Sequence, residues 1–322
     1  MTTRERIGVV GLGFMGRGIA ASLLAHGFEV VALEREPTRC TQATKYIDDA
    51  LLEMRTFGLL PASAPSDWRD HFHATQDLAN LSGCNFVIES IQEDLSAKVP
   101  IYRAMEEHLA PDVPIASNTS ALPISELQRT SAYPNRLIGM HWGEPCYLTR
   151  FLEVIRGSQT DQPTVDRTVA LGRRLDKDPA VVQRDVDGFI VNRLAYAMYR
   201  EAFWLLENEV ADVETIDRAF SHAISVWANI AGPFRWMDLT GLPAYAAVMQ
   251  RLFPKLSCDQ STPQLMKDLV ASGAEGVANG RGFYQYSAEE AEHWRRKLEA
   301  NVLAVRQFHD QWDQTHKALA EQ

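Results

Sequence analysis

Compact runs of apolar residues alternate with stretches of helical periodicity along the first 187 residues. A short apolar run is typical of a buried strand, and apolar residues spaced three and four apart are typical of a helix. The predicted helices cover 14–27, 37–60 and 97–110. The predicted strands are "RIGVVGLG" (6–13), "EVVALERE" (29–36), 85–90, 114–120, 136–142 and 150–157. Strands that alternate with helices predict an α/β domain with a mostly parallel, doubly wound sheet covered on both faces.

The pattern changes near residue 187. From "DGFIVNRLAYAMYREAFWLLENEV" onward, apolar residues recur at helical spacing and strand candidates become rare. We therefore predict a first domain over residues 1–187 and a smaller, all-helical domain over residues 188–322. The charged stretch 288–320 is expected to form one long surface helix.

Composition narrows the classes of function. The 322 residues are 46% hydrophobic and 23% charged, and the net charge of −10 disfavours binding to a nucleic acid. No apolar run is long enough to span a membrane, and glycines interrupt the apolar start, so no signal peptide is expected. The four cysteines lie far apart without a CxxC pair, and His71 and His73 are interpreted as surface residues. No disulfide framework and no metal site are expected, and a cytoplasmic location is predicted.

Glycines crowd the turn after the first predicted strand. Gly11, Gly13 and Gly16 form the pattern G-x-G-x-x-G between a strand and a helix, which permits a tight turn, close approach to a pyrophosphate and close helix packing. Glu34 ends the second strand, where a carboxylate would hold the ribose hydroxyls of NAD; a solvated strand end is the alternative. This carboxylate would repel the extra phosphate of NADP, whereas Arg35 could hold it. The pattern predicts a Rossmann-like domain that binds NAD.

Three further stretches, together with the glycine turn, resemble the 3-hydroxyacyl-CoA dehydrogenase family. They are "SNTSALPISEL", "GMHWGEPCYLTRFLEVI" and "DGFIVNRL", and the resemblance extends to "GPFRWMDLTG" and "GRGFYQY". The resemblance implies that His141 and Glu153 form a pair that performs acid–base chemistry beside the nicotinamide. It implies that Ser120 and Asn192 bind the oxygens of the substrate.

The resemblance also implies cofactor contacts outside the glycine turn. Glu93 and Lys98, in "QEDLSAK", match the family's contacts to the cofactor ribose and nicotinamide. Glu144 stands where the family usually has an asparagine before proline, so a carboxylate replaces an amide beside the nicotinamide. The candidate cofactor-binding residues are Gly11, Leu12, Gly13, Phe14, Met15, Gly16, Glu34, Arg35, Glu93, Lys98, Asn118 and Glu144.

The chemistry of alcohol oxidation supports the same residues. A group must accept the hydroxyl proton while hydride leaves the carbon, and histidine suits this transfer because its pKa lies near the working pH. A carboxylate on the other ring nitrogen fixes the tautomer and stabilises the imidazolium. His141 and Glu153 lie in two neighbouring apolar runs, interpreted as parallel strands that carry them to the cofactor. The alternatives are a buried core histidine for His141, a turn residue for Ser120 and a helix cap for Asn192.

The substrate is the least determined part of the prediction. Lys45 is the only lysine in 37–70, where the acyl-CoA enzymes have a lysine-rich helical segment that touches the CoA phosphates, and Ala278 replaces a lysine near "GFY". Branches of the family that act on small free compounds include L-carnitine dehydrogenase, L-gulonate 3-dehydrogenase with lambda-crystallin, and a pyridine-ring alcohol dehydrogenase. A compact hydroxy acid or ring alcohol is therefore favoured over an acyl-CoA thioester. The candidate anchors for a substrate carboxylate are Arg150, Arg184 and Arg235.

Three classes of function are compared. The favoured one is an enzyme that oxidises a secondary hydroxyl with NAD. A non-catalytic NAD-binding protein of the crystallin kind is the second, and a phosphate-loop nucleotidase is excluded because no G-x-x-x-x-G-K-[ST] occurs. Large apolar side chains on more than one face of 191–207 predict a homodimer through the second domain, as the family resemblance also implies.

Overall fold

The structure is a computed structural model that describes residues 4–320, and it divides into two compact units, Met1–Asn192 and Arg193–Gln322. The division lies slightly beyond the predicted boundary at residue 187. The reason is local: the backbone N–H groups of Ile190 and Val191 both bind Glu153, which ties the linker to the first unit.

The first unit is built on one eight-stranded sheet of order β3-β2-β1-β4-β5-β6-β7-β8. All neighbouring strands are parallel except β6 and β7, which are antiparallel. The doubly wound, mostly parallel sheet is thus confirmed. The strands are β1 (Arg6–Val10), β2 (Glu29–Leu33), β3 (Phe72–Thr75), β4 (Phe86–Glu89), β5 (Ile115–Ser117), β6 (Leu137–Trp142), β7 (Phe151–Arg156) and β8 (Asp178–Val182).

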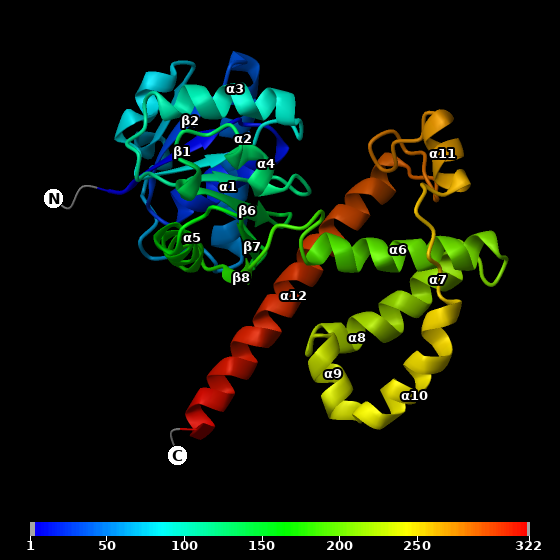
Figure 1. Cartoon of the computed structure of the whole chain (residues 1–322). Coiled ribbons are helices and arrows are strands. Elements are labelled where there is room, and N and C mark those ends of the chain that lie inside the picture. Colours follow the sequence, from blue (N-terminus) through cyan, green and yellow to red (C-terminus); the bar gives the residue numbers. More distant parts are fainter. Residues whose placement is uncertain (1–3, 321–322) are drawn as a thin grey trace. The chain divides into compact units, whose positions relative to one another are not determined.

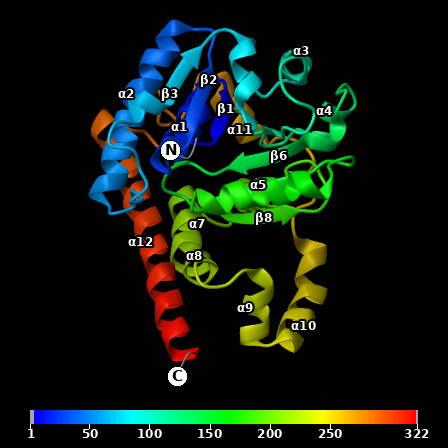
Figure 2. The ribbon, with the colours of Figure 1, turned by 90° about the vertical axis from the view of Figure 1, so that its left-hand side faces the viewer.

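Helices cover both faces of this sheet. Right-handed crossovers place α1, α2 and α5 on one face and α3 and α4 on the other (Figures 1 and 2). The helices are α1 (Phe14–Ala25), α2 (Pro37–Thr56), α3 (Leu95–Glu106), α4 (Ile124–Gln128) and α5 (Gln162–Arg174). Because both faces are covered, the central strands are almost wholly apolar; four of the five residues of β1 are buried.

Three expectations for this unit need correction. β7 runs antiparallel to β6, so Glu153 lies within a strand and not at the carboxyl end of a parallel one. β8 was not anticipated, because "DPAVV" contains an aspartate and a proline; proline is tolerated there since β8 is an edge strand. β5 ends at Ser117, so Asn118, Thr119 and Ser120 belong to the loop that follows.

The second unit is helical apart from two isolated bridges in 276–285, and it contains the long helix expected at 288–320. Its principal helices are α6 (Val191–Glu207), α7 (Val213–Ala219), α8 (Ser225–Ala228), α9 (Pro233–Thr240), α10 (Leu242–Leu252), α11 (Gln264–Ala271) and α12 (Ala288–Ala320). α6 begins two residues before the second unit does. Within residues 4–320, no helix is both long and apolar enough to cross a membrane.

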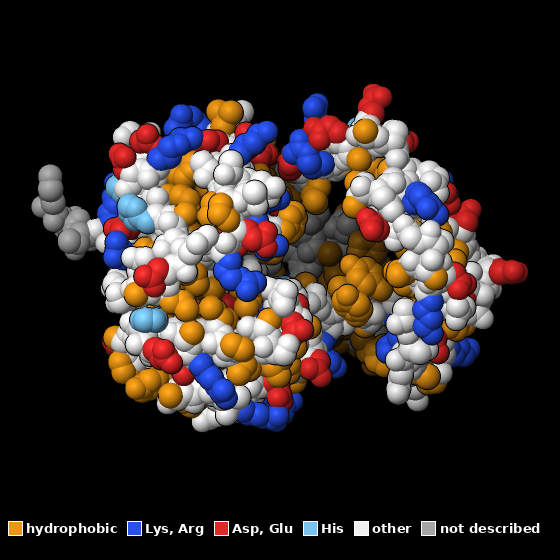
Figure 3. Space-filling view, turned by 90° about the horizontal axis from the view of Figure 1, so that it is seen from above, with side chains coloured by type: hydrophobic (Ala, Val, Ile, Leu, Met, Phe, Trp, Pro, Cys, Tyr) orange, Lys and Arg blue, Asp and Glu red, His pale blue; other side chains and the backbone are white. Residues whose placement is uncertain are grey.

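Apolar side chains are conspicuous at the surface of the second unit. No residue of helices α6 to α11, all in the described range, is buried. Tyr196, Phe234 and Trp294 are 69%, 80% and 52% exposed. Figure 3 shows hydrophobic side chains gathered at the surface. Surface of this kind is typical of a protein–protein interface.

Candidate active site

The glycine turn has the geometry that a dinucleotide needs. Gly11 has a φ of +93°, and a Cβ there would lie 2.8 Å from the carbonyl oxygen of Ser90. A Cβ at Gly16 would lie 1.9 Å from the Gly11 oxygen, whereas a Cβ at Gly13 would meet no atom within 4 Å. Gly13 is the N-cap residue of α1, and no side chain caps that end. Open backbone and uncapped N–H groups at a helix N-terminus fit the pyrophosphate of NAD.

Glu34 lies beside this turn, but its carboxylate is turned inward. The side chain is buried, and its two oxygens accept hydrogen bonds from Leu12 N (2.9 Å) and Glu36 N (3.0 Å). Glu34 therefore braces the turn, and each oxygen keeps a lone pair that could accept from a ribose hydroxyl. Arg35 and Phe14 are exposed, and Met15 is half-buried.

Glu93 and Lys98 meet after β4. Lys98 Nζ lies 3.6 Å from a Glu93 oxygen, and the other Glu93 oxygen accepts from Thr119 Oγ1 (2.6 Å) and Ser120 N (2.8 Å). Partial burial works against the charged form of Glu93, but these bonds and the Lys98 charge outweigh it and lower the pKa of the carboxyl. Asn118 accepts from the backbone of Trp142, so the loop after β5 is held on both sides.

His141 and Glu153 form a buried hydrogen-bonded pair. They stand opposite each other across the antiparallel strands β6 and β7, and Nδ1 of His141 lies 2.8 Å from Oε2 of Glu153. The other oxygen accepts from Ile190 N (3.0 Å) and Val191 N (3.1 Å). Burial works against the charge of Glu153, but these donors outweigh it, so the pKa of the carboxyl is lowered. An ionised carboxylate only accepts, so Nδ1 carries the hydrogen and Nε2 is left free to accept a proton.

Ser120 and Asn192 lie together in the first unit. The Asn192 side chain donates to the backbone oxygen of Ser120 at 2.7 Å. Ser120 is exposed, so a ligand can reach it. The structure therefore links both candidate substrate residues, and Glu93 binds the Ser120 backbone from the other side.

Glu144 lies three residues beyond His141, and the residue is exposed. Neighbouring protein atoms still desolvate its carboxyl in part and raise its pKa, which the hydrogen bonds of Cys146 and the charge of Arg17 partly oppose. The loop that carries Glu144 packs on α1, since a Cβ at Gly18 would lie 3.0 Å from Cys146. Glu144 thus lies close to the first turn of α1, where the cofactor is expected.

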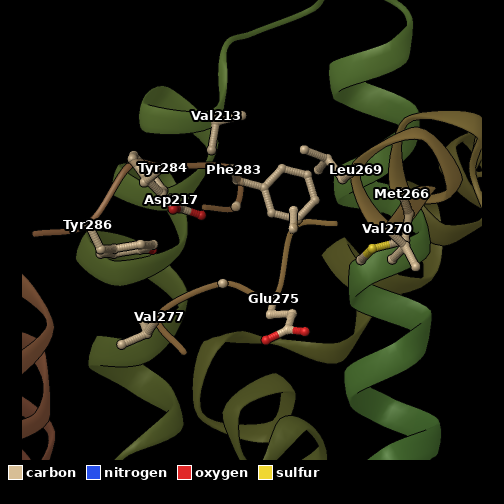
Figure 4. Close-up of a pocket in the computed structure, with 13 residues that line it drawn as sticks. Val213, Asp217, Met266, Leu269, Val270, Glu275, Val277, Phe283, Tyr284 and Tyr286 are labelled. Carbon is tan, nitrogen blue, oxygen red and sulfur yellow. Dashed lines mark hydrogen bonds between the residues drawn. The ribbon is translucent and has the colours of Figure 1, made fainter. Parts of the chain in front are cut away.

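A cavity of about 440 Å³ lies entirely within the second unit. Figure 4 shows Phe283 projecting into it toward Leu269, with Tyr284 beside Asp217 on another wall. The Tyr284 hydroxyl donates to Asp217 at 2.8 Å. The motif "GRGFYQY" therefore lines this cavity, and none of the candidate catalytic residues does.

Sequence reasoning missed Glu89, the last residue of β4. It is fully buried and binds Lys98. An acid at the carboxyl end of an otherwise apolar strand was the signal that could have identified it.

Residues 6–186 match the family model described as "3-hydroxyacyl-CoA dehydrogenase, NAD binding domain", and residues 188–286 match "3-hydroxyacyl-CoA dehydrogenase, C-terminal domain". The chain belongs to this family. It is an NAD-dependent dehydrogenase of the 3-hydroxyacyl-CoA dehydrogenase family, and NAD is its cofactor, as predicted.

Two relatives illustrate the range of this family. The chain is 32% identical to a 5-formyl-3-hydroxy-2-methylpyridine 4-carboxylate 5-dehydrogenase from Mesorhizobium japonicum, over 94% of this chain and 98% of the relative. It is also 32% identical to a probable 3-hydroxybutyryl-CoA dehydrogenase from Deinococcus radiodurans, over 87% of this chain and all of the relative.

The solved structures that resemble this chain include both kinds of enzyme, the pyridine carboxylate dehydrogenase and the 3-hydroxybutyryl-CoA dehydrogenases. A crystal structure of the pyridine carboxylate 5-dehydrogenase, described as an NAD+ dependent dismutase, superimposes with a TM-score of 0.88 and covers 95% of this chain and 98% of its own. The (S)-3-hydroxybutyryl-CoA dehydrogenase from Ralstonia eutropha, 30% identical, gives a TM-score of 0.73 over 88% of this chain and all of its own.

Proposed function

We propose that this family member oxidises a secondary hydroxyl of a compact, free hydroxy compound to the ketone, with His141 as the general base. The observation that carries the proposal is the buried His141–Glu153 pair, in which Nδ1 faces the carboxylate at 2.8 Å and Nε2 is left for the substrate. A candidate base with its tautomer fixed by a carboxylate is the arrangement that alcohol oxidation requires.

The mechanism follows from the contacts of this pair. His141 Nε2 accepts the proton of the substrate hydroxyl as the carbon–hydrogen bond gives up a hydride and the carbonyl forms. Glu153 stabilises the imidazolium, and the N–H groups of Ile190 and Val191 keep Glu153 charged. Ser120 donates to the substrate oxygen, and Asn192, which binds the Ser120 backbone, helps to fix that loop. Bound NAD supplies the acceptor for the hydride.

The residues that would hold NAD lie along the carboxyl edge of the sheet. The uncapped start of α1 receives the pyrophosphate, and Glu34 receives the adenosine ribose. Lys98 and Glu93 lie on the nicotinamide side, between the glycine turn and His141 in the strand order. In this proposal residues 1–187 form the cofactor domain and 188–322 the substrate and dimerisation domain.

A free substrate is favoured over a CoA thioester by the charge of α2 and the loop after it. Residues 37–70 hold five acidic and four basic side chains. One of these cations, Arg69, pairs with Asp48 at 2.5 Å, and Tyr147 donates to Glu53, another acid of α2. The CoA phosphates would find no excess of positive charge here, and each missing charged contact costs on the order of 1 kcal/mol. The relative named for a pyridine carboxylate also matches more of this chain than the one named for 3-hydroxybutyryl-CoA.

A panel of substrates tests the proposal. Formation of NADH should be measured with pyridine-ring alcohols, free 3-hydroxy acids, carnitine, gulonate and L-3-hydroxybutyryl-CoA. We expect kcat/KM to be highest for a free compound. Efficient turnover of the thioester with inert free compounds would establish the second candidate, a 3-hydroxyacyl-CoA dehydrogenase, which the similarity to several 3-hydroxybutyryl-CoA enzymes supports. NADH formation with no member of the panel would favour the non-catalytic alternative.

We also propose a two-fold homodimer through the second unit and a cytoplasmic location. Apolar side chains such as Tyr196 and Phe234 are exposed in the single chain, and a second copy could cover them. The four cysteines lie far apart in the sequence without a CxxC pair, which supports a reducing compartment.

A further inference from the structure

Lys98 is the cation that lies deepest in the candidate cofactor site. Its side chain is 1% exposed, and its Nζ donates to Oε1 of Glu89 at 2.6 Å. Glu89 is itself 0% exposed. A lysine without a counter-charge in such a place would favour the neutral amine, because burial penalises the charged form.

Glu89 is saturated with donors. Beside Lys98, its oxygens accept from Ile91 N (2.7 Å), Tyr102 Oη (3.0 Å) and Ser117 Oγ (2.7 Å). Burial, reinforced by the charge of Glu89, raises the pKa of the Tyr102 phenol, which therefore stays a neutral donor. Two of the four donors lie in α3, one in β5 and one in the loop after β4, and together they hold the Glu89 carboxylate in one position.

The second carboxylate near Lys98 is of a different kind. Glu93 is 41% exposed, lies 3.6 Å from Nζ, and uses one oxygen for the loop after β5. Among the described residues, Glu89 and Glu93 pair with Lys98, and the phenol of Tyr102 binds the same Glu89. Since an ammonium has three donors, the bond to Glu89 and the contact with Glu93 leave one for a ligand.

We propose that Glu89 is a positioning residue that keeps Lys98 protonated and aimed at the cofactor. The proposal rests on the cofactor role proposed for Lys98. Its physical basis is that the closer, fully buried and saturated carboxylate determines the charge of Lys98, whereas the exposed Glu93 is screened by water.

The test is NAD binding as a function of pH. Glu89→Gln removes the charge and keeps the shape, so the neutral amine of Lys98 becomes favoured as pH rises. Binding of NAD should be measured by calorimetry on the full chain from about pH 6.5 to 9. We expect the ratio of the variant Kd to the wild-type Kd to grow from about threefold or less to about tenfold or more, since a charge-assisted hydrogen bond becomes a neutral one. A purely structural defect would raise Kd by the same factor at every pH.

Three further variants distinguish a role of Glu89 in the charge of Lys98 from other causes of weaker NAD binding. Tyr102→Phe removes a donor of Glu89 but no charge, so its Kd ratio should not change with pH. Glu93→Gln should weaken binding by a pH-independent factor, and this variant decides the question if Glu89→Gln does not fold. A pH-dependent ratio in Glu93→Gln, or a constant ratio in Glu89→Gln, overturns the proposal. Lys98→Met tests the assigned cofactor role: unchanged NAD affinity in that variant refutes the underlying proposal.

Discussion

Glu153→Gln tests the His141–Glu153 pair most directly, because it removes a charge and keeps the shape of the side chain. Glu153 uses both of its oxygens as acceptors, one for His141 Nδ1 at 2.8 Å and one for Ile190 N and Val191 N at 3.0 and 3.1 Å. A glutamine has one acceptor oxygen and an NH₂ group that only donates. It cannot make both sets of bonds.

The structure indicates which of these hydrogen bonds the glutamine keeps. If the amide oxygen faced His141, the NH₂ group would face two buried N–H donors, at about 1–3 kcal/mol for each unsatisfied group. If the oxygen faces Ile190 and Val191 instead, the NH₂ group donates to Nδ1 of His141. The hydrogen of the neutral ring then moves to Nε2, which can no longer accept the substrate proton. We expect kcat to fall by about 10³–10⁴, the scale for a catalytic histidine held in the wrong tautomer.

The lowered pKa of Glu153 also predicts how the stability of the two proteins depends on pH. Its pKa lies below the ordinary value of 4.5, because its hydrogen bonds outweigh the effect of burial. A lowered pKa contributes stability that is present above the unfolded value and is lost as pH falls through the folded value. The free energy of unfolding of the wild type should therefore exceed that of Glu153→Gln near neutral pH, and the difference should shrink below about pH 4.5.

The assay combines NADH formation with denaturant titration, using the best substrate from the panel. Glu126→Gln, in which the carboxylate pairs with Arg129 at the surface, is the matched control and should change neither quantity. A Glu153→Gln variant that keeps more than about a tenth of the wild-type kcat would refute the tautomer argument. Unchanged stability at neutral pH would refute the assigned hydrogen bonds.

Four further results are expected. His141→Asn should leave NAD affinity by calorimetry nearly unchanged and lower turnover by about 100-fold or more, whereas near-normal turnover would exclude His141 as the base. The wild type should bind NAD at least about tenfold more tightly than NADP, and Glu34→Ser should narrow this gap; equal affinities in the wild type would exclude the repulsion. Burial lowers the pKa of Lys177 to about 8, so between about pH 8 and 10.5 the unfolded chain binds the lysine proton more tightly than the folded chain does. Urea titration should therefore show the free energy of unfolding of the wild type rising relative to that of Lys177→Met over this range. Light scattering at micromolar concentration should give the mass of a dimer, and a monomer mass would contradict the proposed interface.

The parts of the site that depend on local backbone chemistry could be predicted from the sequence. Gly11 has the positive φ that its place in the motif suggested, and Gly16 leaves no room for a Cβ. The mostly parallel sheet followed from the alternation of apolar runs and helices. These features are encoded within a few neighbouring residues, so the pattern alone indicates them.

The antiparallel direction of β7 could have been predicted, because the connection at 143–150 is too short for the crossover that parallel strands need. Features that depend on hydrogen bonds between distant residues could not be predicted. The inward turn of Glu34 depends on the N–H of Leu12, and the burial of Glu89 depends on donors from α3 and β5. The four roles assigned by resemblance stay predictions until variants are measured, although the structure brings His141 to Glu153 and Ser120 to Asn192.

The antiparallel pairing of β6 with β7 has a consequence for protein engineering. His141 and Glu153 are joined by the sheet register and not by the connection between them, since each faces the other directly across the ladder. The connection at 143–150 could therefore be exchanged for a longer or shorter one without moving the pair, provided that both strands keep their pairing. One residue inserted inside β7 between Glu153 and the turn would instead send that carboxylate to the opposite face of the sheet. A loop grafted from relatives in place of the one that carries Glu144 could therefore change what the site accepts, provided that it keeps the buried packing of Cys146 and Leu148.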